Sequence, residues 1–231
     1  GCTSLKSINI PNLVTTIEYY TFADCKALES IDIPNSVTRI NSWAFGRCES
    51  LKSFVMPNSV TSTESGIFSE CKSLTSLTLS NSLTRIERDI CWYCTALESI
   101  IIPDGVESIG GYAFYGCSSL KSIAIPNSVK TIEDNTFDGC YSVSSLTIST
   151  NVKRIDGCAF CSTSLSSIKV NTNSITEFVE SNLLSLLFET AGVSWYNLPD
   201  GIHVYIDGVE QTGHLVIPEG TTSINRFAFC Q

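Results

Sequence analysis

The chain has 231 residues, of which 43% are hydrophobic and only 16% charged, a composition typical of a folded domain. No apolar run approaches the roughly 18 residues that a membrane-spanning helix needs, so this chain is not predicted to cross a bilayer. The formal net charge is −9 and no basic stripe is present, which argues against nucleic acid as a partner, because phosphates are neutralised by lysine and arginine.

Cysteine recurs at a spacing of 23 residues through most of the chain. The cysteines in this register are Cys2, Cys25, Cys48, Cys71, Cys94, Cys117 and Cys140. Leucine, isoleucine, proline and phenylalanine keep the same register, and the unit reads L-x-S-I-x-I-P-N-S-V-x-x-I-x-x-x-x-F-x-x-C-x-x. A tandem repeat of this length is the signature of a solenoid, in which each unit forms one coil.

Each unit begins with a predicted short strand, as in "LESIDIP" at residues 28–34. Apolar and polar residues alternate there, so Ile31 and Ile33 are expected to point inward while Ser30 and Asp32 point outward. The strand ends at Pro34, because proline has no N–H to donate.

The rest of the unit is expected to complete the coil. Asn35 and Ser36 favour a turn, since their side chains bond to nearby backbone. Val37 and Ile40 are predicted to return to the interior in a second short extended piece, and a helical turn through 45–48 is expected to close the coil.

One coil alone cannot bury enough apolar surface to be stable, so the coils must stack with each strand beside the next. The predicted fold class is an α/β solenoid, a right-handed leucine-rich-repeat coil with a parallel strand sheet. Short second strands or turns are expected on its other side. We treat residues 1–231 as a single domain and as a piece of a longer array.

The cysteine column has two interpretations. Equivalent positions in adjacent coils lie about 5 Å apart, which is within disulfide range. We favour reduced, buried thiols, because cysteine behaves as a small hydrophobe and fits a tight internal corner. Two C-x-x-C pairs, 91–94 and 158–161, lie three coils apart and cannot share one zinc ion. A local disulfide at 158–161 is an alternative that we do not favour.

Residues 171–212 leave the repeat register. A capping box at Ser174 and Glu177, apolar residues at helical spacing and a stop at Gly192 predict an amphipathic helix. Alternation around 207–208, an Asp-Gly pair, predicts a hairpin. The repeat resumes near Leu215, so this helix-plus-hairpin island is interpreted as an insertion within the array.

The segments "LKSIAIPNSVKTIEDNTFDGC" and "VYIDGVEQTGHLVIPEGTTSINRFAF" resemble BspA-type leucine-rich repeats. Proteins of this kind occur at the surface of host-associated bacteria and some parasitic protists. The resemblance implies an extracellular or cell-surface protein that binds other proteins, in some members host matrix components. It implies no catalytic residue. No basic region followed by an apolar stretch marks a signal peptide in this sequence.

The outward positions of the predicted sheet are the candidate binding surface. They form a uniform column of serines beside a variable column. The residues predicted to contact a partner are Val55, Thr78, Ile101, Ala124 and Thr147, together with Ser76, Ser99 and Ser122. The alternative is that serine merely tolerates a crowded sheet and that the surface has no role in binding.

Two further columns are open to interpretation. Tyr20, Trp43 and Tyr112 share one repeat position, where aromatic rings serve either as an interface or sugar platform or as half-buried packing. An acidic column could attract a cation, but a solvated edge is favoured. Its members are Glu18, Glu64, Glu87, Glu133 and Asp156.

The sequence contains only two histidines, His203 and His214, and no catalytic or phosphate-binding motif. We therefore predict a non-catalytic protein without cofactor or metal. Two hypotheses follow: a recognition module that binds an extracellular or host protein or a glycan through its strand face, and a passive stalk that spaces another domain from a cell. The sequence makes no prediction of the oligomeric state.

Overall fold

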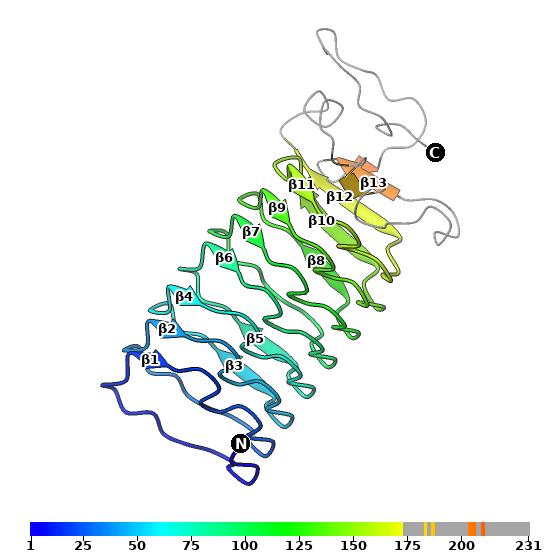
Figure 1. Ribbon diagram of the computed structural model, residues 1–231. Helices are drawn as coiled ribbons and strands as arrows, with labels where there is room; N and C mark the ends of the chain where they lie inside the picture. Colours follow the sequence, from blue (N-terminus) through cyan, green and yellow to red (C-terminus); the bar gives the residue numbers. More distant parts are fainter. Residues whose placement is uncertain (173–182, 184–185, 188–202, 207–208, 211–231) are drawn as a thin grey trace.

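The computed structural model describes residues 1–172, 183, 186–187, 203–206 and 209–210. Over these residues the chain winds into an elongated solenoid, and two columns of short strands run along its length (Figure 1). Among the described residues, no helix has the length and apolar character needed to cross a membrane.

The first column carries the L-x-S-I-x-I segment of each repeat. Its strands are β3 (Ser53–Val55), β5 (Ser76–Thr78), β8 (Ser122–Ala124), β10 (Ser145–Ser149), β12 (Ser167–Asn171) and β13 (His203–Ile206). Neighbouring strands in this column are parallel and pair equivalent residues, such as Phe54 with Leu77. Residues 99–101 occupy the rung between β5 and β8 without forming a strand, so the column is divided into two sheets.

The second column confirms the predicted second extended piece. Its strands are β1 (Thr16–Ile17), β2 (Arg39–Ile40), β4 (Ser62–Thr63), β6 (Arg85–Ile86), β7 (Ser108–Ile109), β9 (Thr131–Ile132) and β11 (Arg154–Ile155). They form a three-stranded and a four-stranded parallel sheet. The second residue of each strand is buried, so one side of this ladder faces the core.

The proline-linked turn between the two columns is also confirmed. The N–H of Val37 donates to the carbonyl of Pro34 at 3.0 Å, three residues earlier. The same bond recurs after Pro11, Pro57, Pro103 and Pro126. In these coils proline ends the extended segment and also supplies the carbonyl that closes the turn. Ser80 and Ser149 supply the carbonyl in two other coils.

The predicted helical turn through 45–48 is wrong, because every second backbone amide of this region bonds to the next coil. Phe45 N–H donates to Ile67 at 3.0 Å and Arg47 N–H donates to Ser69 at 2.8 Å. These amides are therefore not available to a helical ladder. No residue of 1–172 is helical, so the fold is a parallel-strand β-solenoid of about seven turns instead of the α/β class expected.

Two left-handed residues per coil allow this chain path. The first set is Tyr20, Trp43, Gly66, Asp89, Tyr112, Asn135 and Cys158, and the second is Asp24, Arg47, Glu70, Tyr93, Gly116, Gly139 and Ser162. All have φ between 53° and 75°. Most of them are the third residue of a tight turn closed by a backbone hydrogen bond, as Arg47 is in the turn from Phe45 to Cys48. This position tolerates positive φ. We call the surface formed by residues 18–24 and their equivalents the turn face.

Little of the predicted island lies among the described residues. Leu183, Leu186 and Leu187 are helical, and Leu183 and Leu187 are buried in the core. Strand β13 pairs with β12 in parallel and with β14 (Val209–Glu210) in antiparallel fashion. Residues 203–206 thus occupy the next rung of the first column. The complete helix-plus-hairpin insertion and the resumed repeat lie largely outside the described residues and stay predictions.

Phenylalanine rings stack along the axis inside the coils. Phe22 and Phe45 have ring centroids 5.3 Å apart, as do Phe137 and Phe160. Cys91 takes the phenylalanine position in one coil and is fully buried there. The stack is therefore divided into two shorter ones, each of parallel rings in contact with the next coil.

The cysteine column consists of buried, reduced thiols from Cys25 to Cys140, in agreement with the interpretation favoured from the sequence, whereas Cys2 is exposed. Each thiol from Cys48 onward donates to a carbonyl of the preceding coil. The contacts are Cys48 to Phe22, Cys71 to Phe45, Cys94 to Phe68, Cys117 to Cys91 and Cys140 to Phe114, at 3.1–3.3 Å. The column satisfies buried carbonyls as well as filling a corner.

Burial of these thiols makes the protein sensitive to high pH. Loss of solvation raises the pKa of Cys48 and of Cys140 from 9.0 to about 12. Above pH 9 the unfolded chain loses these protons while the folded chain keeps them, so stability falls as pH rises towards 12. Each thiol should remove about 1.4 kcal/mol of unfolding free energy per pH unit in this window. Urea denaturation under reducing conditions at increasing pH will measure the slope.

The control is the variant Cys48→Ala/Cys140→Ala. It should be less stable at neutral pH but should lose stability less steeply above pH 9, because two of the titrating groups are gone. Identical slopes in the two proteins would contradict the proposed origin of the alkaline sensitivity.

Gly116 and Gly139 provide a second test, since both have positive φ, of 70° and 75°. A Cβ on Gly116 would lie 2.8 Å from the ring of Tyr93, whereas one on Gly139 meets nothing closer than 3.4 Å. Gly139→Ala should cost about 1 kcal/mol of unfolding free energy from backbone strain alone. Gly116→Ala should cost more, and the excess should vanish in a Tyr93→Ala background, as thermal and urea unfolding will show.

Candidate functional site

The exposed side chains of the first strand column form one continuous surface, which we call the strand face. The structure places all the residues predicted to bind a partner on it. Val55 lies directly beside Thr78, and Ala124 directly beside Thr147. Val55 is 64% exposed and Ile101 is 83% exposed, values that are high for apolar side chains of a folded protein.

The strand face is not a uniform apolar patch. Thr78 separates Val55 from the rung that carries Ile101, so a hydroxyl side chain interrupts the apolar ones along the axis. Ser76, Ser99 and Ser122 are exposed beside them. Thr147 and Ser145 are half-buried, whereas the equivalent positions in the preceding coils are exposed.

A charged column that sequence reasoning missed borders the serines. Lys52 contacts Glu29 at 3.4 Å, and Lys121 contacts Glu98 at 2.6 Å, each pair 23 residues apart. The bond from Lys121 lowers the pKa of Glu98. These pairs could have been predicted from opposite charges spaced by one repeat length, because equivalent positions lie side by side in a solenoid.

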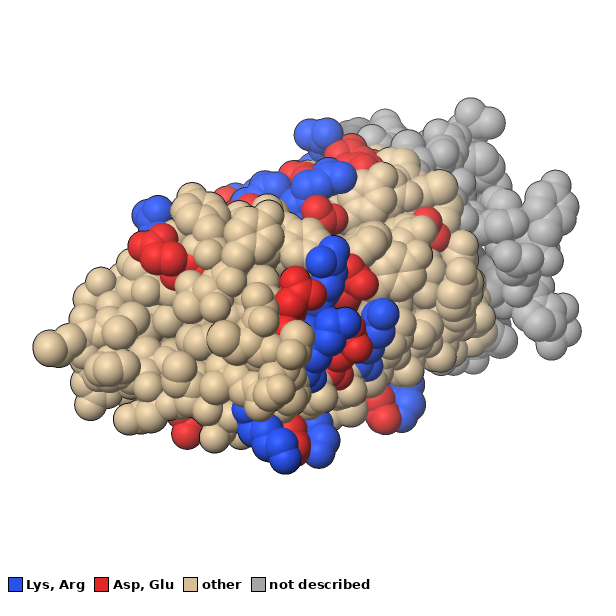
Figure 2. All heavy atoms as spheres, turned by 60° about the horizontal axis from the view of Figure 1, so that its bottom comes forward, with Lys and Arg blue, Asp and Glu red and all other residues tan. Residues whose placement is uncertain are grey.

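Charges elsewhere on the surface are paired in the same way. Figure 2 shows lysine and arginine atoms lying against aspartate and glutamate atoms in small groups, with uncharged surface between them. Lys130 contacts Glu107 at 3.1 Å, and Lys26 contacts Glu49 at 2.9 Å. Such exposed pairs contribute little stability, but they leave the face in this view without a basic stripe.

The carboxylates of the acidic column bond to hydroxyl and guanidinium groups of the protein itself. Ser42 donates to Glu64 at 2.9 Å, and this bond is the main cause of the lowered pKa of Glu64. Arg85 bonds Glu133 at 2.7 Å, and Arg154 bonds Asp156 at 2.7 Å. Among the residues that the structure describes, no group of histidine, cysteine or acidic side chains could hold a metal ion.

The aromatic residues of the turn face fall into two groups. Tyr112 is half-buried, with the guanidinium of Arg88 4.5 Å from its ring centroid, and it packs against Tyr115. Tyr20 is 60% exposed and lies nearly parallel to the half-buried ring of Trp43. Packing accounts for the first group, whereas the second presents a ring face to solvent.

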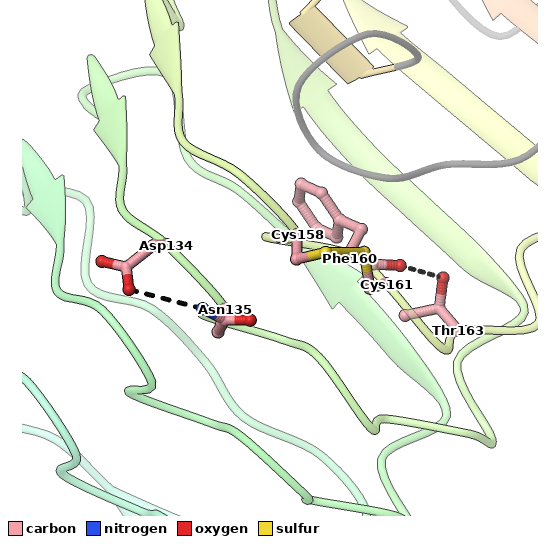
Figure 3. Close-up of a disulfide and its surroundings, with 6 residues drawn as sticks. All are labelled: Asp134, Asn135, Cys158, Phe160, Cys161 and Thr163. Carbon is pink, nitrogen blue, oxygen red and sulfur yellow. Dashed lines mark hydrogen bonds between the residues drawn. A yellow bond between two sulfur atoms is a disulfide. The ribbon is translucent and has the colours of Figure 1, made fainter.

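The structure contains a disulfide between Cys158 and Cys161, so the preference against one there was wrong (Figure 3). Cys158 occupies a left-handed turn position, and the repeat's usual cysteine position is taken by Thr163, whose hydroxyl donates to Phe160 at 2.8 Å. The tight turn brings the two side chains together. Cys91 and Cys94 are instead buried thiols, and burial raises the pKa of Cys91.

Comparison with known proteins agrees with this geometry. The sequence profile described as "BspA type Leucine rich repeat region" matches residues 1–95 and 86–191, in 6 copies. The chain belongs to this family. The match covers the solenoid coils and part of the island, so the predicted resemblance is confirmed.

Solved structures of leucine-rich repeat proteins share the fold. A leucine-rich cell surface protein from Faecalibacterium prausnitzii is 32% identical, covering 62% of this chain and 48% of that one, with a TM-score of 0.52. A leucine-rich repeat protein from Eubacterium ventriosum is 26% identical, covering 69% and 43%, with a TM-score of 0.65. One from Bacteroides ovatus is 24% identical, covering 90% and 56%, with a TM-score of 0.59.

The chain spans about half the length of these relatives. No protein with a curated sequence record matches it closely. Both the BspA-type family and the solved relatives are leucine-rich repeat proteins, and no enzyme family is among the matches.

Proposed function

We propose that this chain is a non-catalytic recognition module of a surface-exposed, adhesin-like protein, which binds a protein or glycan partner through its strand face. The observation that carries the proposal is the exposure of Ile101 and Val55, 83% and 64%, at outward positions of the first strand column. Apolar side chains held out from a rigid surface gain free energy when a partner removes them from water.

The chemistry of the strand face fits such a partner. Val55, Ile101 and Ala124 supply apolar contact, while Thr78 and the serine column supply hydroxyl groups that both donate and accept hydrogen bonds. The adjacent Glu–Lys pairs leave no strong field of either sign. A polar surface with apolar points and little net charge is typical of interfaces between separately folded proteins, and it also suits a glycan.

Three observations support a location at or outside the cell surface. The family is that of BspA-type repeats, and a 32% identical relative is named a cell surface protein. In addition, a disulfide joins Cys158 and Cys161, and disulfides persist mainly in oxidising compartments. The buried thiols of the cysteine column are compatible with the same environment, because the core shields them.

The alternative is a passive stalk between an anchor and another domain. Hydrogen bonds between successive coils on the strand columns and on the turn face favour this role, because they make the solenoid a stiff rod. A stalk needs no exposed apolar side chains on one column, which is why recognition is preferred.

Substitution of Ile101 tests the strand face. Ile101→Asp should weaken binding at least about tenfold, because a charge replaces a desolvated apolar contact at the centre of the surface. The measurement is surface plasmon resonance against a panel of purified extracellular matrix proteins and glycans. The matched control is Leu13→Asp, since Leu13 is 93% exposed but lies on a turn outside the strand face.

Both variants should keep the melting temperature of the parent protein, because both side chains are largely in water. Equal affinity in Ile101→Asp and the parent would reject the strand face as the binding surface. Failure of every matrix protein and glycan in the panel to bind would favour the stalk.

A further inference from the structure

A small pocket lies on the turn face between the first two coils, away from the strand face. Its volume is about 180 Å³, and it is lined by Tyr20, Ala23, Asp24, Trp43, Gly46 and Arg47. These are three pairs of equivalent positions, each 23 residues apart. We call the rings of Tyr20 and Trp43 the aromatic wall, and the side chains of Asp24 and Arg47 the charged wall. The two meet at Arg47, whose guanidinium lies 5.8 Å from the centroid of the Trp43 ring.

The aromatic wall is held in place by the backbone beneath it. A Cβ placed on Gly46 would lie 2.6 Å from the ring of Trp43, and one on Gly66 would lie 2.7 Å from its indole Nε1. The indole therefore lies flat on two glycines. Tyr20 lies next to it, with ring centroids 6.3 Å apart and planes 20° apart, and its outer side is open to solvent.

The two aromatic residues also have a backbone conformation that bulky side chains rarely adopt. Tyr20 and Trp43 have φ of 56° and 57°, a region in which bulky residues are disfavoured. At the same repeat position Gly66, Asp89 and Asn135 tolerate this conformation well, while Tyr112 and Cys158 adopt it as well. Strained residues of this kind gather at ligand sites, where another gain offsets the strain.

The charged wall sets the chemistry of the ligand. The Asp24 carboxylate and the Arg47 guanidinium are 3.7 Å apart, longer than a hydrogen bond, so each keeps capacity for a further partner. Arg47 also bonds Glu70 at 3.1 Å, which balances its charge. With carboxylates on both sides of one guanidinium, the site has no excess positive charge and does not favour an anion.

We propose that this pocket binds a neutral sugar. A pyranose presents an apolar C–H face that packs on the exposed ring of Tyr20, and hydroxyl groups at its edge that donate to Asp24 and accept from Arg47. A proline-rich peptide would also pack on the rings, but it has no donors for the carboxylate. It would also need an outward indole N–H, whereas Trp43 Nε1 lies against Gly66.

The test uses saturation-transfer NMR and tryptophan fluorescence with the whole chain. The probes are the neutral disaccharides cellobiose, lactose and N,N′-diacetylchitobiose, with sialyllactose as an anionic sugar and oligoproline as a peptide. At least one neutral disaccharide should bind. Tyr20→Ala should weaken that binding about tenfold, because the stacking surface is lost. Asp24→Asn should weaken it less, since an amide still accepts one hydrogen bond.

Two controls separate this site from the strand face and from general effects. Tyr141→Ala removes a ring that is 64% exposed in another coil and should leave sugar binding unchanged, as should Ile101→Asp. The proposal is overturned if no neutral disaccharide binds, if binding survives Tyr20→Ala, or if sialyllactose or oligoproline is preferred. Because the strand face is not involved, either proposal can fail without the other.

Discussion

Hydrogen bonds between equivalent backbone groups of successive coils are the constraint on which the rest of this structure depends. They occur in both strand columns and again on the turn face, where Phe22 N–H donates to Ala44 and Phe45 N–H donates to Ile67. A chain held this way must place every side chain above its equivalent in the next coil. The stacked phenylalanines, the thiol-to-carbonyl bonds and the Glu–Lys pairs are all consequences of that register.

The same constraint separates structural positions from free ones. Inward positions favour residues that pack against the same residue type in the next coil. Cys91 is an exception, and it interrupts the phenylalanine stack. Outward positions can vary from coil to coil, as in the column of Val55, Thr78 and Ile101. The protein can therefore acquire binding surfaces on either face without altering its core.

Much of the fold follows from the sequence, because a 23-residue period fixes which residues are neighbours. The inward isoleucines, the turns after proline, the second strands and the exposed strand face could all be predicted from one repeat. The way in which each coil closes could not be predicted from one repeat. The amides of Phe45 and Arg47 donate to the next coil, and no single repeat shows that partner. The disulfide was missed because C-x-x-C does not reveal that Cys158 lies in a left-handed turn.

The candidate sites divide in the same way. The strand face was predictable from the alternation of apolar and polar residues along each strand. The pocket beside Tyr20 and Trp43 was not, because it depends on the orientation of the aromatic side chains. A partial signal exists, since Gly66 and Gly116 each follow an aromatic residue by 23 positions and lie beneath its ring. Aromatic and glycine residues at this spacing indicate a ring that covers the neighbouring coil.

The column of thiols has a consequence for biogenesis. Before the coils close, neighbouring cysteines of a chain in an oxidising compartment can join to the wrong partners, and such cross-links would lock coils out of alignment. Once each thiol donates to its carbonyl, oxidants no longer reach it. If the chain folds in an oxidising compartment, as proposed, the solenoid has to wind faster than its sulfurs are oxidised. Later damage should then begin at the fraying ends and not in the middle.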